Sequence, residues 1–224
     1  MSEQLESPAT LILAQTRGGL VEFRGPTSFS NPDGSPVSIS PSNKFTHLGL
    51  RLRLAPQLSA NGRYVAFVVD EAPIIVCDAE LGSIVAQIDC IDAQYVEFSP
   101  LGNYLVTFSR HRGGSDPCDG NQRVWQVDGG TLVAQYLQKV FKKNAIQWTS
   151  DEVYLLRHVT NEVHIYLVVD LSTGTYFKVT HRGLNSFRVS PTSNPLHVVV
   201  FNPESSGNPA RVTLYRVGAV TGKN

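Results

Sequence analysis

The sequence DAELGSIVAQI at residues 78–88 recurs as DGGTLVAQY at residues 128–136 and as DLSTGTYFKV at residues 170–179. Each copy has an aspartate, a turn that contains glycine, and a hydrophobic run that favours a β-strand. A second marker recurs along the chain, where an apolar residue is followed by a hydroxyl residue at Ser59, Ser99, Thr149 and Ser190. These four positions are 40, 50 and 41 residues apart, which is the period of a four-stranded β-propeller blade.

The intervals between the markers are filled with strand-like runs. Continuous hydrophobic stretches such as LHVVVF at residues 196–201 indicate strands that are covered on both faces, as in stacked blades. An insertion at residues 111–121 accounts for the longest interval. The sequence therefore predicts an all-β, WD-repeat-like propeller that is incomplete, with about four to five blades of a larger ring.

The domain layout follows from this repeat. Residues 1–9 are expected to be disordered, residues 10–220 to form blades, and residues 221–224 to be a tail. The repeats are expected to start near residues 58, 98, 148 and 189. Because a final repeat that stops near Val220 leaves an unpaired edge, we expect the chain to be marginally stable or self-associating.

The N-terminal part departs from the repeat. Residues 10–24 predict a hairpin, because Gly18 and Gly19 permit the positive φ angles of a tight turn. Residues 25–46 predict a loop or an edge strand, with only VSIS at residues 37–40 strand-like, because they hold Pro26, Pro32, Pro36 and Pro41. The stretch AQYLQKVFKKN at residues 134–144 is the one candidate for a helix.

Composition indicates a globular protein that lacks the net positive charge typical of nucleic-acid-binding proteins. The chain has 224 residues, of which 42% are hydrophobic, and its 19 basic residues balance 19 acidic ones. Since a surface that holds a phosphate backbone usually shows a basic excess, binding through net charge is disfavoured, although a local patch can remain.

Cysteine usage and hydropathy bear on the compartment. The three cysteines, Cys77, Cys90 and Cys118, form no Cys-x-x-Cys pair, and their odd number leaves no closed disulfide set. The N-terminus is acidic where a signal peptide is basic, and no apolar run approaches the roughly 18 residues of a membrane span. We therefore expect a cytoplasmic protein without a membrane partner.

No catalytic or metal-binding pattern is evident. The nearest approach to a serine nucleophile elbow, at residues 113–117, lacks the final glycine and lies in a polar insertion. The histidines have no helical i, i+4 spacing of a zinc site, and they are His47, His111, His158, His164, His181 and His197. The sequence thus predicts no enzyme, no cofactor and no metal.

Two groups of residues are candidates for contacts with RNA. The best basic grouping consists of Arg110, Arg112, Lys142 and Lys143, which we take as a candidate RNA or ribosome contact, with an ordinary solvated surface as the alternative. Aromatic residues within the strands are expected to pack between blades, with base stacking as the alternative, and they are Tyr95, Phe98, Tyr104, Trp125 and Trp148.

The order of segments resembles the N-terminal propeller of the eukaryotic translation initiation factor 2A family. The resemblance is carried by TRGGLVEFRGP at residues 16–26, RVWQVDGGTLVAQYLQK at 123–139, NAIQWTSDEVYLLRHVTNEVHIY at 144–166 and FRVSPTSNPLHVVVF at 187–201. It implies a cytoplasmic, non-catalytic factor that brings initiator methionyl-tRNA to the small ribosomal subunit, dependent on the start codon and not on GTP. Its implied partners are that subunit, the tRNA, mRNA and other initiation factors.

Two other readings stay open. The Gly-His and Trp-Asp dipeptides of typical WD repeats are missing, and Trp125 is followed by Gln126, so the propeller is divergent. A propeller scaffold subunit of initiation factor 3 would have a similarly divergent ring. The gating propeller of a prolyl-peptidase-like hydrolase would need an appended α/β domain with a nucleophile elbow.

Overall fold

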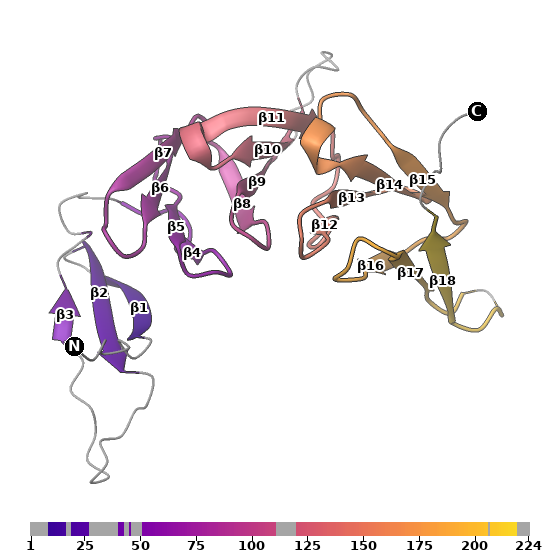
Figure 1. The fold of residues 1–224 in the computed structure, drawn as a ribbon, viewed down its shortest axis with the longest axis horizontal. Coiled ribbons are helices and arrows are strands. Elements are labelled where there is room, and N and C mark those ends of the chain that lie inside the picture. The colour runs from indigo at the N-terminus through magenta and orange to yellow at the C-terminus, as the bar shows by residue number, and fades with distance from the viewer. Residues whose placement is uncertain are drawn as a thin grey trace, which may run out of the picture.

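The structure is a computed structural model that describes residues 9–16, 19–26, 40–42, 45, 51–110, 120–205 and 207–218. Within those residues the regular structure consists of strands and two single 3-10 turns, η2 (Asp128–Gly130) and η3 (Val168–Asp170). The strands form five antiparallel sheets that follow one another along an arc (Figure 1). The predicted all-β, incomplete propeller is confirmed, and we number its sheets as blades 1 to 5.

Blade 1 is the three-stranded sheet β1 (Ala9–Thr16), β2 (Gly19–Pro26) and β3 (Ser40–Ser42). The predicted hairpin is confirmed, because β1 and β2 pair with Thr16 opposite Gly19. Strand β3 contains Pro41 and lies at the end of the strand order, the position that proline tolerates. Of the strand expected at residues 37–40, only Ser40 lies within the described residues.

Blades 2, 3 and 4 each have four strands in simple sequential order. Blade 2 is β4 (Gln57–Leu58), β5 (Tyr64–Phe67), β6 (Ile74–Asp78) and β7 (Ile84–Ile88). Blade 3 is β8 (Ala93–Phe98), β9 (Tyr104–Ser109), β10 (Gln122–Gln126) and β11 (Thr131–Tyr136). Blade 4 is β12 (Ile146–Trp148), β13 (Tyr154–Val159), β14 (Glu162–Leu167) and β15 (Phe177–Thr180).

Blade 5 is described with three strands, β16 (Ser186–Val189), β17 (Leu196–Asn202) and β18 (Arg211–Val217). Strands β4, β8, β12 and β16 lie along the inner side of the arc, and β7, β11 and β15 along its outer side (Figure 1). The helix considered at residues 134–144 is absent, since β11 takes its first residues and no helix follows among the rest. No helix in the described part of the chain has the length and hydropathy of a membrane span.

The hydroxyl markers of the sequence lie where each innermost strand ends. Ser99 Oγ accepts the backbone N–H of Tyr104 at 2.9 Å and donates to the carbonyl of the same residue at 3.2 Å. Ser59 makes the same two bonds with Tyr64, at 2.9 and 3.2 Å. The repeated hydroxyl thus closes the turn between the first and second strands of a blade.

The third residue after the hydroxyl has a positive φ in the turns of blades 2, 3 and 4. It is Gly62 at 72° in blade 2 and Gly102 at 79° in blade 3. In blade 4 the equivalent residue is Glu152, at 54°. A left-handed conformation is unfavourable for a residue with a Cβ atom, so Glu152 needs compensating contacts.

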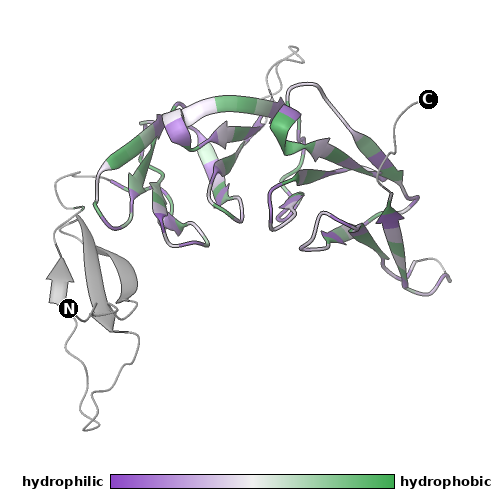
Figure 2. Ribbon diagram, viewed as in Figure 1, coloured by the Kyte–Doolittle hydropathy of each residue, from purple (hydrophilic) through white to green (hydrophobic). Residues whose placement is uncertain are grey.

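The core lies between neighbouring blades. Apolar side chains of blades 2 and 3 form one buried cluster, those of blades 3 and 4 a second, and those of blades 4 and 5 a third. Hydrophobic residues accordingly line the strands of blades 2 to 5 (Figure 2). Because these blades share their buried clusters with their neighbours, their stability depends on the stacking of adjacent repeats.

Aromatic packing between blades is confirmed at two positions. The rings of Tyr64 and Phe98 join blades 2 and 3 at 6.5 Å, and those of Tyr104 and Trp148 join blades 3 and 4 at 5.4 Å. Trp125 is buried within the cluster between blades 2 and 3, and its Nε1 donates to Thr107 Oγ1 at 3.0 Å.

Candidate interaction surface

The four candidate contact residues differ in how they are placed. Arg110 is exposed directly after β9, and Lys143 is exposed in the connection between β11 and β12. Lys142 is half-buried, and its Nζ donates to the carbonyl of Asn185. Arg112 lies outside the described residues, as do the rest of the predicted insertion up to residue 119 and the near-match to a nucleophile elbow at residues 113–117.

Buried Asn121 brings the two basic segments to the same end of blade 3. Its Nδ2 donates to the carbonyls of Ser109, at 2.8 Å, and Gln138, at 2.9 Å. Its Oδ1 also accepts the backbone N–H of Gln138, at 2.8 Å. The end of β9, which is followed by Arg110, is therefore fixed beside the connection between β11 and β12.

Arg157 secures this connection from the neighbouring blade. The side chain is buried on β13, and its guanidinium donates to the carbonyl of Leu137 at 2.6 Å and to Gln138 Oε1 at 3.3 Å. The same group lies 4.8 Å from the centre of the Tyr136 ring. Burial raises the pKa of Tyr136, so the ring stays neutral beneath the guanidinium.

Phe141 anchors the connection on blade 3. Its ring lies 5.1 Å from that of Tyr95 and 5.0 Å from that of Phe108, in tilted orientations that suit aromatic pairs. It nevertheless remains 45% exposed, and the preceding Val140 is 73% exposed. Tyr95, which was expected to pack between blades, thus contributes to a surface cluster with Phe141.

A hollow of about 470 Å³ opens beside this cluster, at the junction of blades 3 and 4. We call it the Phe141 hollow; its lining includes Val140, Phe141, Lys142, His158, Thr160 and Leu184. The His158 ring is buried with its edge toward Phe187 at 6.3 Å, and its Nε2 lies 3.0 Å from the carbonyl of Thr160. Burial, followed by the Lys142 charge, holds the pKa of His158 below its ordinary value.

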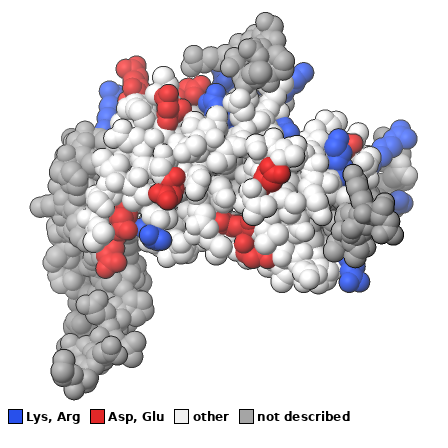
Figure 3. Space-filling model, turned by 45° about the horizontal axis from the view of Figure 1, so that its top comes forward, with Lys and Arg blue, Asp and Glu red and all other residues white. Residues whose placement is uncertain are grey.

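Charge is distributed unevenly along the arc, although the net charge is zero. From residue 129 onward the sequence has ten basic and five acidic residues, and no acidic residue lies between Asp128 and Asp151. Lys and Arg side chains gather over the C-terminal part of the molecule in Figure 3, while acidic groups lie over the middle and N-terminal parts. Net charge alone concealed this asymmetry, which a count over each half of the sequence would have found.

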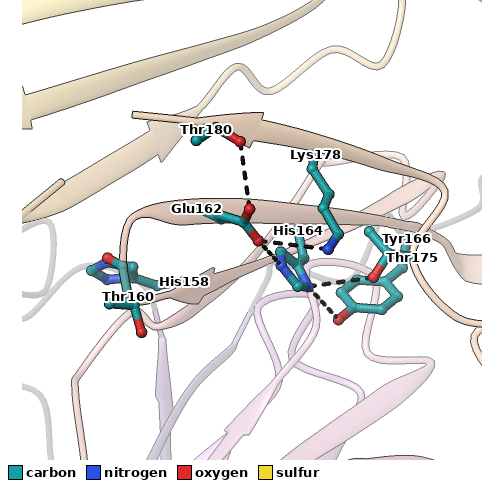
Figure 4. A network of polar contacts seen from close by, with 8 residues as sticks. All are labelled: His158, Thr160, Glu162, His164, Tyr166, Thr175, Lys178 and Thr180. Carbon is teal, nitrogen blue, oxygen red and sulfur yellow. Dashed lines mark hydrogen bonds and ion pairs between the residues drawn. The ribbon is translucent and has the colours of Figure 1, made fainter. Parts of the chain in front are cut away.

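A polar network covers the outer part of blade 4 (Figure 4). His164 Nε2 lies 2.7 Å from Glu162 Oε2, and Lys178 Nζ lies 3.6 Å from the same oxygen. The hydrogen bond with His164 is the main cause that lowers the pKa of Glu162. The contacts of His164 Nδ1 with Tyr166 and Thr175, at 3.4 and 3.3 Å, are also internal to the blade.

The described residues contain no group of three or more His, Cys, Asp or Glu side chains that could hold a metal ion. Cys77 and Cys90 are buried free thiols, and burial raises the pKa of Cys77 to about 11. Cys118 lies outside the described residues.

Comparisons with known proteins return translation initiation factors. No family model matches the chain. It is 34% identical over 71% of its length to eukaryotic translation initiation factor 2A of Schizosaccharomyces pombe, and 26% identical over 71% to that of Dictyostelium discoideum. It is also 30% identical over 55% of its length to a subunit of eukaryotic translation initiation factor 3 from Drosophila virilis. These matches span 27%, 26% and 17% of the respective relatives.

Solved structures share the architecture. A crystal structure described as that of the eukaryotic initiation factor superposes with a TM-score of 0.75 at 26% identity, over 97% of this chain and 51% of the other. The C-terminal WD40 domain of Sif2 superposes with a TM-score of 0.52 at 11% identity, over 93% of this chain and 55% of the other. The second likeness shows the fold alone.

Proposed function

The chain is a relative of the eukaryotic translation initiation factor 2A family, and from this premise we propose that it acts in translation initiation as a binding module. The similarity in sequence over 71% of the chain carries the proposal. The names of the relatives and the propeller fold favour a role without catalysis.

The finer proposal comes from the family resemblance. The chain takes part in directing initiator methionyl-tRNA to the small ribosomal subunit in the cytoplasm, in a manner that depends on the start codon and not on GTP. The mRNA and other initiation factors are its further proposed partners. Since the chain spans about a quarter of the length of the initiation factor 2A relatives, we expect it to contribute part of this binding.

The proposed RNA or ribosome contact is the basic grouping of Arg110, Arg112, Lys142 and Lys143. Arg110 and Lys143 are exposed and free to approach a phosphate group. Lys142 is less suited, because it donates to Asn185 and burial lowers its pKa. We therefore expect weak association with the subunit, in which phosphate contacts are few.

Co-sedimentation with purified small ribosomal subunits across a salt series tests this proposal. The variant replaces the four grouped residues by alanine, and the matched control replaces four exposed cations elsewhere, namely Arg63, Lys178, Arg188 and Arg216. Each lost phosphate contact should reduce the slope of log affinity against log salt by about one unit. The placement of the contact would be refuted if the chain binds tightly with a steep salt dependence, and if the control variant reduces this dependence while the variant of the four grouped residues does not.

A second candidate function is that of a propeller scaffold in initiation factor 3, which the 30% identity to the Drosophila virilis protein favours over a shorter part of the chain. Co-precipitation with the other subunits of initiation factor 3 would distinguish the two. The hydrolase alternative gains no support from the relatives named above.

A further inference from the structure

We propose that the Phe141 hollow is a docking site for a short acidic segment of a partner protein, which inserts one apolar side chain into the hollow. This inference goes beyond the proposed function, and it does not require that the chain bind the ribosome.

The apolar floor of the hollow suits an inserted side chain. Val140 and Phe141 expose 73% and 45% of their surface at its rim, and the buried Leu184 and the ring of His158 lie within it. Exposed large apolar side chains that gather around a concavity are typical of interaction sites. The volume of about 470 Å³ is ample for one aromatic or branched aliphatic side chain.

The charge around the hollow specifies an acidic partner. Lys139 and Lys143 are exposed on the same connection, and Arg110 is exposed at the neighbouring end of β9. None of the described residues that line the hollow is acidic. The carboxylates of Asp92 and Glu97, on the blade 3 side, already accept hydrogen bonds from Ser109 and Tyr95 at 2.8 and 2.7 Å. Acidic side chains that flank the anchor would meet Arg110, Lys139 and Lys143, which form no ion pair with the part of the chain that the structure describes.

The same features favour a peptide over single-stranded RNA. A nucleobase needs a flat, open aromatic face, whereas Phe141 is tilted against Tyr95 and Phe108 and its exposed neighbour Val140 is aliphatic. Lys142, the cation that lines the hollow, is occupied by the Asn185 carbonyl. An apolar cavity with a cationic rim matches an amphipathic acidic segment better than a phosphate backbone.

The site is ordered before a partner arrives. The bonds of Arg157 to Leu137 and of Asn121 to Gln138 fix the start of the connection, and the Lys142 bond to Asn185 fixes its far side. Preorganisation of this kind reduces the entropy lost on binding.

Fluorescence anisotropy with labelled peptides tests the proposal on the full chain without ribosomes. The probes are short Asp/Glu peptides that carry one central Phe, Leu or Trp, the same peptide with a central Ser, and a uridine oligonucleotide of equal length. We expect the apolar-centred peptides to bind, the Ser-centred peptide to bind at least about tenfold more weakly, and added salt to weaken binding.

Variants locate the binding. Phe141→Ser and the surface change Val140→Asp should each weaken the peptide about tenfold or more, and Lys139→Glu with Lys143→Glu should do the same. Phe201→Ser, at a residue that is 38% exposed on β17, and Lys178→Glu are the matched controls and should leave affinity unchanged. Val140→Asp keeps the test valid if Phe141→Ser does not fold, because Val140 is largely exposed.

Three results would overturn the proposal. The first is that no apolar-centred peptide binds, and the second is that the Ser-centred peptide binds as tightly as the apolar-centred ones. The third is that the oligonucleotide binds more tightly than the peptides and that the Val140 and Phe141 variants weaken its binding. The ribosomal proposal is tested separately. The chain can fail to co-sediment with the subunit and still bind the peptide, and it can co-sediment with the subunit and not bind the peptide.

Discussion

The guanidinium carbon of Arg157 lies 4.8 Å from the centre of the Tyr136 ring, so a strand of blade 4 holds the outermost strand of blade 3. Arg157 is buried and Tyr136 half-buried, and the guanidinium also forms a hydrogen bond with the chain just after Tyr136. The junction of blades 3 and 4 is thus held by a charged group and not by apolar packing alone.

Arg157→Met should destabilise the chain by about 2 kcal/mol, because the carbonyl of Leu137 and the amide oxygens of Gln122 and Gln138 lose their donor. Denaturant unfolding measures this loss, and hydrogen exchange should show faster exchange just after β11. Arg63→Met is the matched control, since Arg63 also lies over a tyrosine ring, at 4.9 Å from that of Tyr64, but is exposed. Equal effects of the two substitutions would contradict a special role for Arg157.

Glu152→Gln should cost about 1 to 3 kcal/mol, because the buried carboxylate accepts the N–H of Leu101 at 2.7 Å and Asn103 Nδ2 at 2.9 Å. Glu152→Gly should also destabilise, although it relieves the positive φ of 54°. Thermal melting of both variants measures how the loss of the hydrogen bonds compares with the relief of backbone strain.

Exposed Glu71, with φ of 53°, is the matched control for backbone strain. Glu71→Gly should leave the melting temperature unchanged or slightly raised, because glycine adopts this φ freely. A Glu152→Gly variant that is more stable than the parent chain would show that strain outweighs the contacts with blade 3.

Acidification should destabilise the folded chain in part through His158. Its pKa is lowered on folding, so below the ordinary value of 6.5 the unfolded chain binds a proton that the folded chain does not. This contribution to stability is complete above pH 6.5 and is lost as pH falls toward the lowered pKa.

Denaturant unfolding between about pH 7.5 and about pH 5 measures the effect of His158. The variant His158→Gln should show a shallower loss of stability over this range. Lys142→Met should reduce the loss by a smaller amount, because burial is the larger cause of the shift. An unchanged slope in His158→Gln would assign the pH dependence to other groups.

The exposed strand β18 should promote self-association. Val212 and Leu214 are 67% and 64% exposed on this strand, which pairs with β17 and stands last in the order of its sheet. Replacing both by lysine should shift the chain toward monomer in size-exclusion chromatography with light scattering. Leu81→Lys, at a residue that is 72% exposed in a turn, is the control. A parent chain that is monomeric at all concentrations would refute this prediction.

The sequence predicted what depends on local spacing. The hydroxyl at Ser99 acts within one turn, so the repetition of this marker indicated the blades before any contact was known. The bond between Arg157 and Leu137 could not be foreseen, because it joins residues 20 apart on different blades. The hydrogen bond from Lys142 to the Asn185 carbonyl could not be foreseen for the same reason. The sequence grouping therefore overstated how many of its cations are available to bind a phosphate group.

The two tryptophans are built-in optical reporters of different events. Trp148 stacks on Tyr104 across the junction of blades 3 and 4 and is half-buried, so its emission should respond when the two blades separate. Trp125 is 6% exposed in the cluster between blades 2 and 3, and its indole is bonded to Thr107 of blade 3, so its emission should respond when blades 2 and 3 separate or when blade 3 itself melts. Single-tryptophan variants would therefore resolve whether the junction of blades 3 and 4 opens before the surroundings of Trp125 on the other side of blade 3 are lost.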